Sequence, residues 1–203
     1  MSTRARARRT YDMSSRAESS RATRERILTA ALGLFRDEPF DAITMARIAR
    51  LAGVSLQTVV LHFRTKTGLI EALAEWWQPK EEELRHVEDG DPRVAAERIC
   101  ARYEEMGAMT LRLLASEDRL PERMRALIEA GRQSHRAWVE RTFARGLGVG
   151  AARRRRTMAL VAVYDIYTWH VLRRVLSPDE TIATMTDMAE DVLARARAKG
   201  VRS

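Results

Sequence analysis

The side chains of this sequence that are best suited to catalysis or metal binding are four histidines and a single cysteine. The histidines show no metal-ligand spacing such as His-Glu-x-x-His; they are His62, His86, His135 and His170. Cys100 can form neither an internal disulfide nor, by itself, a thiolate zinc site, and no glycine-rich phosphate loop occurs. The sequence therefore predicts no enzyme, with no catalytic residue, no metal and no cofactor. Side chains distant in sequence can still converge, so a helical enzyme stays an alternative.

A different chemistry is offered by the stretch SLQTVV, residues 55–60. Gln57 can pair with the groove edge of adenine, Thr58 can bond a base or a phosphate, and Leu56 can press on a thymine methyl. Val60 shares their outward side. Phosphate contacts position a protein on DNA without reading its sequence; we expect them from Thr44 and Lys66, and from His62 or Arg47. These side chains together predict contact with double-stranded DNA.

The stretch that carries these residues has the punctuation of two short helices joined by a tight turn. Thr44 can cap the first helix, Gly53 supplies conformational freedom at the turn, and Ser55 can cap the second helix. Val59 is expected to point back at the first helix. The spacing predicts a helix-turn-helix, whose second helix enters the major groove. A tight helical hairpin inside an ordinary core fits the same spacing.

Positive charge is concentrated at the N-terminal end of the chain. Residues 1–66 hold 13 Lys and Arg against 6 Asp and Glu, which leaves 23 against 22 for the remainder. A local positive field favours a polyanionic partner and supports DNA binding over a core hairpin. Arg4, Arg6, Arg8 and Arg9 could enter a minor groove, or they could form a solvated tail without a role.

Helical periodicity runs through almost the whole chain, and no strand pattern appears. In TRERILTAALGLF, apolar residues recur at helical spacing from Ile27 to Phe35, and Pro39 ends this helix. A helix over 67–87 is interrupted or ended near Pro79. Longer helices are expected at 93–115, 122–146, 152–176 and 179–199, with turn-forming stretches between them. The chain is therefore predicted to be all-α.

Several motifs fall in order between residues 21 and 75. TRERILTAALGLF is followed by FDAITMARIARLAGVSLQTVVLHFRTKTGLIEALA, which contains IARLAGVS, the pair His62 and Phe63, and Lys66. With these motifs the chain resembles the N-terminal DNA-binding domain of TetR-type transcriptional regulators. Two departures bear on the contact pattern and the operator sequence: Val60 stands where the family usually has tyrosine, and Pro39 where it commonly has glycine.

The resemblance implies an all-α homodimer with an N-terminal three-helix DNA-binding domain and a larger helical domain that dimerises and encloses a small-molecule pocket. The expected domains are a disordered basic tail at 1–20, the helix-turn-helix domain at 21–67, and the ligand-binding and dimerisation domain at 68–203. The expected DNA-binding residues are Thr44, Arg47, Ser55, Leu56, Gln57, Thr58, Val60, His62 and Lys66.

Two apolar-rich helices near the chain end could form half of a four-helix bundle with a second copy. The apolar residues are Val161, Val163, Ile166, Val171, Leu172 and Val175 in the first, and Ile182, Met185, Met188, Ala189, Val192 and Leu193 in the second. A purely internal core is the alternative reading of the same pattern.

Adaptable apolar side chains that could line a ligand pocket also fill ordinary helical cores. The candidates are Tyr103, Met106, Met109, Trp138, Asp165 and Trp169. Asp165 interrupts the apolar run MALVAVYDIYTWHVL, where a buried charge needs a partner. We expect it to accept a hydrogen bond from Tyr103, His135 or Trp138, with a ligand cation as the less favoured alternative.

Together these features predict a cytoplasmic regulator that binds a near-palindromic operator and that a small-molecule effector releases. Repression is what the resemblance implies. The N-terminus MSTRARARRTYD lacks the apolar core of a signal peptide, and no apolar run is long enough to span a membrane. The alternative is a nucleoid-type protein with mainly non-specific phosphate contacts. Only the regulator predicts a large ratio of specific to non-specific affinity.

Overall fold

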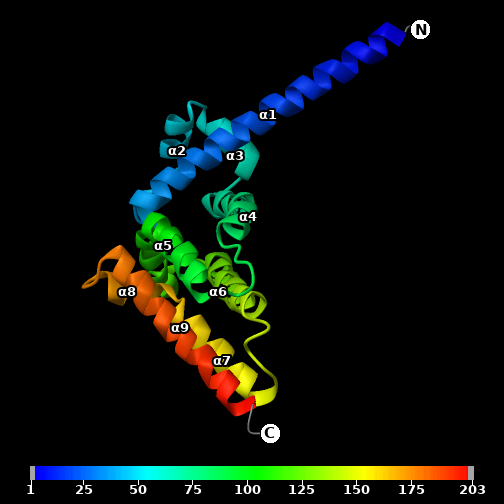
Figure 1. The fold of residues 1–203 in the computed structure, drawn as a ribbon. Coiled ribbons are helices and arrows are strands. Elements are labelled where there is room, and N and C mark those ends of the chain that lie inside the picture. The colour runs from blue at the N-terminus through cyan, green and yellow to red at the C-terminus, as the bar shows by residue number, and fades with distance from the viewer. Residues whose placement is uncertain (1–2, 201–203) are drawn as a thin grey trace. The chain divides into compact units, whose positions relative to one another are not determined.

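The chain is helical throughout the part that the structure describes. The computed structural model describes the backbone of residues 3–200 and the side chains of residues 17–194, and it contains no strand between residues 3 and 200. The elements (Figure 1) are α1 (Thr3–Asp37), η1 (Phe40–Ala42), α2 (Met45–Ala52), α3 (Leu56–Phe63), α4 (Lys66–Leu84), α5 (Pro92–Ala115), η2 (Glu117–Arg119), α6 (Glu122–Thr142), α7 (Gly150–Val163), α8 (Ile166–Arg173) and α9 (Pro178–Gly200). The all-α prediction is confirmed.

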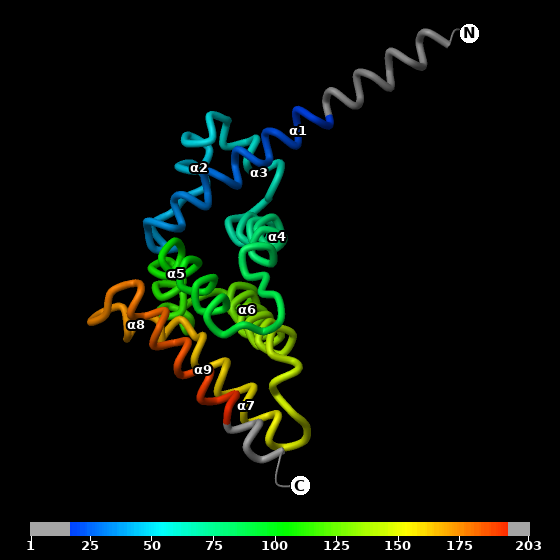
Figure 2. Tube along the Cα trace, viewed as in Figure 1, coloured from blue at the N-terminus to red at the C-terminus, as the bar shows by residue number. Residues whose placement is uncertain are grey.

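The helices form two compact units that divide between Trp77 and Gln78, inside α4. In the first unit, α2 packs against α1 and α3 packs against α2 (Figure 2). The core of this unit is made of apolar side chains from α1 to α4: Ile27, Leu28, Ala31, Leu34, Phe35, Ile43, Ile48, Ala49, Ala52, Val59, Phe63, Leu69, Ala72 and Leu73. Helical spacing in α1 predicted most of its share of this core.

The second unit is built around α5, which packs against α8 and along α9, while α7 contacts both α6 and α9. Its core contains an aromatic cluster in which Tyr164 is fully buried. The Tyr164 ring lies 5.5 Å from the ring of Trp138 and 5.5 Å from that of Phe143, measured between centroids. Aromatic pairs at such distances stabilise a core beyond the area they bury.

The helix predicted over 152–176 is in fact two helices, α7 and α8, and the break falls at Tyr164 and Asp165. Asp165 caps α8, because its Oδ1 accepts a hydrogen bond from the backbone N–H of Tyr167 at 2.9 Å. Thr168 Oγ1 donates to the Ala162 carbonyl across the break at 2.6 Å. The break could not be seen in the periodicity because apolar residues continue through it.

Two further helix ends differ from the sequence prediction. α6 ends at Thr142 rather than 146, and α4 continues through Pro79 to Leu84. Pro79 lacks a backbone donor, so α4 loses one internal hydrogen bond there. The stretch 1–20 was predicted to be disordered, but from Thr3 onward its backbone is helical and forms the first part of α1; residues 1–2 and the side chains through residue 16 lie outside the description. Among the described residues, no helix has the length and apolarity needed to cross a bilayer.

Candidate nucleic-acid interface

The turn between α2 and α3 has the caps that the sequence predicted. Thr44 Oγ1 accepts from the backbone N–H of Arg47 at 3.3 Å, and Ser55 Oγ accepts from the N–H of Thr58 at 3.0 Å. Gly53 ends α2 with φ 65° and ψ 39°, a left-handed conformation that glycine adopts without strain. These local bonds hold two eight-residue helices in a helix-turn-helix.

The inner side of α3 is fixed by burial in the core of the first unit. Val59 is fully buried and Phe63 nearly so, together with Ile48 and Ala49 of α2. The Arg24 guanidinium lies over the Phe63 ring, 5.5 Å from its centroid. This packing sets the rotation of α3 about its axis, and it therefore decides which side chains face outward.

The outward face of α3 is mostly apolar. Leu56 is 48% exposed, Val60 43% and Leu61 81%, and Gln57 is exposed beside them. Thr58 is half-buried, and its hydroxyl lies 2.8 Å from Ser55 Oγ, so these two hydroxyls satisfy each other.

Two of the predicted phosphate contacts have structural partners. Lys66 Nζ donates to the carbonyls of Phe40 at 2.7 Å and Ile43 at 2.9 Å, and it lies 3.8 Å from the Phe40 ring centroid. Burial lowers the pKa of Lys66, and Asp41 partly offsets this shift. An ammonium group has three donors, and the two carbonyls take two of them.

Arg47 makes a two-armed contact with the Glu38 carboxylate at 2.5 and 2.6 Å and also donates to the Ala42 carbonyl at 3.1 Å. The hydrogen bond to Glu38 is the main cause that raises the pKa of Arg47. Thr44 is exposed at the start of α2, whereas His62 is half-buried beside Phe63. Arg47 and Lys66 thus tie the η1 segment to the helix-turn-helix.

Three exposed residues near this surface were missed in the sequence. Leu61 is four residues after Gln57 and so shares its side of α3. Arg50 lies in the last turn of α2, and Arg64 follows α3 with φ 60°. Both arginines are exposed. Helical spacing counted from Gln57 would have found Leu61, whereas the arginines needed the observed exposure.

The six residues expected to line a ligand pocket mostly belong to the packed core of the second unit. Met106, Trp138 and Trp169 are buried, and Tyr103 and Met109 are half-buried. The Tyr103 hydroxyl donates to the Tyr164 carbonyl at 3.0 Å.

The expected partners of Asp165 are wrong, because Tyr103, His135 and Trp138 each bond a backbone carbonyl instead. Its carboxylate caps α8, so its role in the structure is local to the helix start. The capping role agrees with the structural reading that the sequence favoured.

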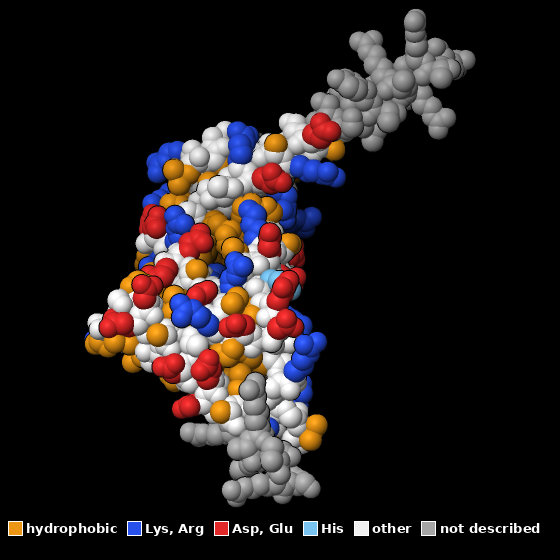
Figure 3. Space-filling model, viewed as in Figure 1, with side chains coloured by type: hydrophobic (Ala, Val, Ile, Leu, Met, Phe, Trp, Pro, Cys, Tyr) orange, Lys and Arg blue, Asp and Glu red, His pale blue; other side chains and the backbone are white. Residues whose placement is uncertain are grey.

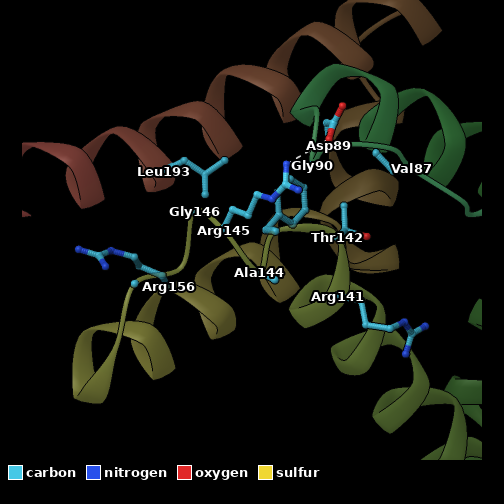
Figure 4. Close-up of a pocket in the computed structure, with 12 residues that line it drawn as sticks. Val87, Asp89, Gly90, Arg141, Thr142, Ala144, Arg145, Gly146, Arg156 and Leu193 are labelled. Carbon is cyan, nitrogen blue, oxygen red and sulfur yellow. Dashed lines mark hydrogen bonds and ion pairs between the residues drawn. The ribbon is translucent and has the colours of Figure 1, made fainter.

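One hollow of about 540 Å³ lies beside the loop after α6 and is lined by Asp89, Arg141, Arg145, Arg156 and Leu193, among others. Figure 4 shows the Arg145 side chain extending toward Asp89, while Arg141 and Arg156 point away. Arg145 and Asp89 form an ion pair at 3.3 Å, but both side chains are almost fully exposed. Solvent screens such a pair strongly, so this ion pair gives the hollow little fixed polar structure.

A second hollow, of about 510 Å³, lies at the end of α4 against α6, and its lining includes Glu81, Arg85, Trp138 and Arg141. Arg85 is only 8% exposed. Its guanidinium lies 4.6 Å from a Trp138 ring centroid, and one nitrogen lies 2.7 Å from Nδ1 of His135. Trp138 Nε1 in turn donates to the Arg85 carbonyl at 2.7 Å.

The protonation of His135 follows from these contacts. Burial, and then the charge of Arg85, lowers the pKa of His135 to about 4. The neutral ring accepts from Arg85 at Nδ1 and donates from Nε2 to the Val161 carbonyl at 3.3 Å. Burial likewise lowers the pKa of Arg85. Glu81, on the α4 side of the cluster, pairs with both Arg85 and Arg102.

The histidines and the cysteine, which are the side chains best suited to catalysis or metal binding, form no such site among the described residues. The described residues contain no group of three metal-ligating His, Cys, Asp or Glu side chains. Cys100 is buried beside Met185 Sδ at 3.6 Å, and burial raises the pKa of its thiol to about 12. A thiol of this kind is not an activated nucleophile.

Comparison with known proteins agrees with the fold and with the helix-turn-helix. Residues 27–73 match the family described as bacterial regulatory proteins, tetR family. No curated protein matches the sequence. A TetR transcription regulator from Haloarcula marismortui has a TM-score of 0.64 at 18% identity, over 85% of this chain and 97% of that chain.

Two further solved structures have the same fold. NalD, the secondary repressor of the MexAB-OprM multidrug efflux pump in Pseudomonas aeruginosa, has a TM-score of 0.61 at 24% identity, over 86% of this chain and 97% of its own. The reduced form of NemR from E. coli has a TM-score of 0.57 at 20% identity, with 87% and 96% covered. Residues 27–73 thus match the DNA-binding domain of the tetR family of bacterial regulatory proteins, and the chain has the fold of TetR transcription regulators.

Proposed function

We propose that the protein is a repressor that binds a near-palindromic operator as a homodimer and leaves it when a small molecule binds the second unit. The observation that carries the proposal is the capped helix-turn-helix, which holds the outer face of α3 in solvent. A helix presented in this way fits the major groove. Of the solved structures with this fold, NalD is described as a repressor.

The DNA contacts that we propose start from the residues expected in the sequence. Leu56, Gln57 and Val60 face the groove, and Thr44 and the free donor of Lys66 reach phosphates. Ser55 and Thr58 contribute mainly by holding the start of α3. The exposed Arg50 and Arg64 add phosphate contacts. Arg47 and His62 stand at the edge of this surface.

The proposed dimer interface is the exposed apolar side of α8 and its neighbours. Val171 is 64% exposed and Val175 80%, and Tyr167, Met158 and Met188 are also exposed. Val163, Ile166, Met185 and Ala189, which the sequence pattern grouped with them, are buried inside the unit itself. Large exposed apolar side chains grouped on neighbouring helices are typical of a protein interface.

The dimer is tested by light scattering on a Val171→Asp, Val175→Asp double variant. We expect the native chain to be a dimer at micromolar concentration and the variant to be a monomer with weakened operator binding. Leu84→Asp, which changes an exposed leucine of α4, serves as the control and should stay dimeric. A native chain that stays monomeric would refute the dimer.

The proposed effector site is the hollow at the end of α4 beside Arg85 and Trp138. α4 carries Glu81 and is also the helix that crosses from the first unit into the second. A ligand that shifts the end of α4 would therefore act on the helix that leads to the helix-turn-helix. If the ligand lowers the affinity for DNA by some factor, DNA lowers the affinity for the ligand by the same factor. For any compound suggested by the regulated genes, equal operator affinity with and without saturating compound would exclude it as effector.

The central experiment is selection of binding sites from fragmented genomic DNA of the source organism, at near-physiological salt with excess competitor DNA. We expect a few fragments that share a near-palindrome with half-sites about one helical turn apart, or a multiple of it. Uniform recovery that disappears as salt rises would contradict the regulator and support a nucleoid-type protein.

A further inference from the structure

We infer that α3 reads DNA chiefly through the C5 methyl groups of pyrimidines, and that Leu61 is a specificity-determining residue. The inference rests on the proposed function, because it assumes that α3 enters the major groove of an operator. The groups that α3 recognises are the C5 methyl of thymine and the identical methyl of 5-methylcytosine.

The geometry of α3 places its apolar side chains together on the outward side. Leu56 and Val60 are four residues apart, as are Gln57 and Leu61, and residues at this spacing are neighbours on one side of a helix. Val59 and Phe63 occupy the buried side. With 81% of its surface exposed, Leu61 has the most apolar area to lose on contact with a ligand.

Polar recognition from this face is limited to one side chain. The hydroxyls of Ser55 and Thr58 are bonded to each other and to the helix start. Gln57 makes no side-chain hydrogen bond to the described residues, so it can pair with an adenine. α3, with the sequence LQTVVLHF, has no Lys or Arg, and the common two-armed recognition of guanine by those residues is therefore not available from it.

An apolar face in the major groove has one kind of apolar partner on the base edges. Thymine carries its C5 methyl there, whereas the other edge groups are hydrogen-bond donors or acceptors. Burying one methyl against leucine or valine raises affinity about fourfold. Several such contacts in two half-sites multiply, and they select sequences rich in thymine opposite Leu56, Val60 and Leu61.

The test is a parallel selection from two libraries of the same genomic fragments, one amplified with dTTP and one with dUTP. Uracil lacks only the C5 methyl. We expect a shared near-palindrome from the thymine library and little enrichment from the uracil library. The same palindrome from both libraries would overturn the methyl inference and leave the regulator in place, whereas no shared sequence from either would overturn both.

Substitutions at single bases of the operator then test which position Leu61 contacts. In the recovered operator, replacing one contacted thymine by uracil should weaken binding about fourfold, and 5-methylcytosine in place of cytosine at a contacted position should strengthen it. With Leu61→Ala, the thymine-to-uracil ratio should fall to one at one position in each half-site, while Leu84→Ala, at an exposed leucine of α4, keeps every ratio. Ratios unchanged by Leu61→Ala would refute its role.

Salt gives an independent readout on the same complexes. Phosphate contacts weaken steeply as salt rises, but an apolar contact with a methyl group releases no counterions. We expect the overall affinity to fall with salt while the thymine-to-uracil ratio stays constant. A ratio that falls in parallel with affinity would show that the methyl acts through backbone electrostatics, and it would overturn the inference. Circular dichroism of Leu61→Ala serves as the control for folding.

Discussion

Apolar side chains are usually buried and charged ones exposed, and each unit of the protein contains an exception to this rule. The first unit exposes apolar side chains, whereas the second buries a charge. In the first unit, three aliphatic side chains of α3 stand in solvent, while the cation of Lys66 is tied to backbone carbonyls. In the second unit, the guanidinium of Arg85 is buried against Trp138 and His135. Exposed apolar patches and buried charges are the informative exceptions to burial, and here each marks a surface that we propose binds a partner.

The surroundings of the two exceptions also differ. The exposed leucines rest on a short hairpin fixed by caps and by one buried side, so they can change without disturbing the core. Arg85, the residue after α4, is hydrogen-bonded to His135 and Trp138 of α6, and His135 is bonded in turn to the Val161 carbonyl of α7. Figure 3 shows hydrophobic side chains, in orange, scattered among charged ones on the visible face. Single exposed apolar residues of that kind need no explanation, whereas a grouped set on a reading helix does.

The largest expected effect is a difference in stability between variants on the buried side and on the exposed side of α3. Phe63→Ala should lower the free energy of unfolding of the first unit by about 3–5 kcal/mol, because it leaves a cavity in the core. Leu61→Ala should change it by less than about 0.5 kcal/mol. Urea unfolding followed by circular dichroism measures both; a large loss of stability with Leu61→Ala would place that residue in the core and break the comparison.

The next effect concerns the buried network of the second unit. Since the pKa of His135 is lowered to about 4, only the unfolded chain takes up this proton between pH 6.5 and 4. The free energy of unfolding is therefore complete above pH 6.5 and falls by about 3 kcal/mol as the pH drops to 4. His135→Gln should flatten this part of the stability profile, whereas His86→Gln, at an exposed position, should not. An unchanged profile in His135→Gln would mean that this histidine is not held neutral.

A smaller effect tests how tightly the apolar groups of the second unit are packed. A Cβ at Gly107 would lie 2.7 Å from the Trp169 ring, while one at Gly131 meets nothing within 4 Å. Gly107→Ala should therefore lower the free energy of unfolding by about 1–3 kcal/mol. Gly131→Ala should raise it by about 0.5–1 kcal/mol, because alanine favours helix. Thermal unfolding measures the stability of both variants. Equal effects would show that the packing around Trp169 adjusts easily to an added methyl group.

The smallest effect concerns the cap that starts the reading helix. Ser55→Ala removes the acceptor for the Thr58 N–H and should lower the free energy of unfolding of the first unit by about 1 kcal/mol. Hydrogen exchange at the first amides of α3 should become faster than in Ser134→Ala, a matched change inside α6. If exchange in α3 stays the same, the hairpin is held by its buried side alone.

Sequence patterns were sufficient where the structure depends on near neighbours. The caps Thr44 and Ser55 and the left-handed Gly53 follow from local hydrogen bonding and sterics, which involve residues only a few positions apart. The all-α class likewise follows from periodicity. The motifs of residues 21–75 also indicated the tetR family before any contact was known.

Packing between helices decided what those patterns could not. The break at Asp165 was hidden, because apolar residues continue on both sides of it and only the fold requires the chain to turn there. Four of the twelve apolar residues expected at a dimer interface are buried in the core, since periodicity gives an apolar side but not what covers it.

The sequence by itself therefore determined the all-α class, the helix-turn-helix and the resemblance of the N-terminal domain to the tetR family. The tertiary structure decided that Arg50 and Arg64 are exposed beside α3 and that Arg85 lies buried against Trp138 and His135. The physical reason is range: capping and turn energies act between neighbours along the chain, whereas exposure and the cost of a buried charge depend on side chains brought together from distant helices.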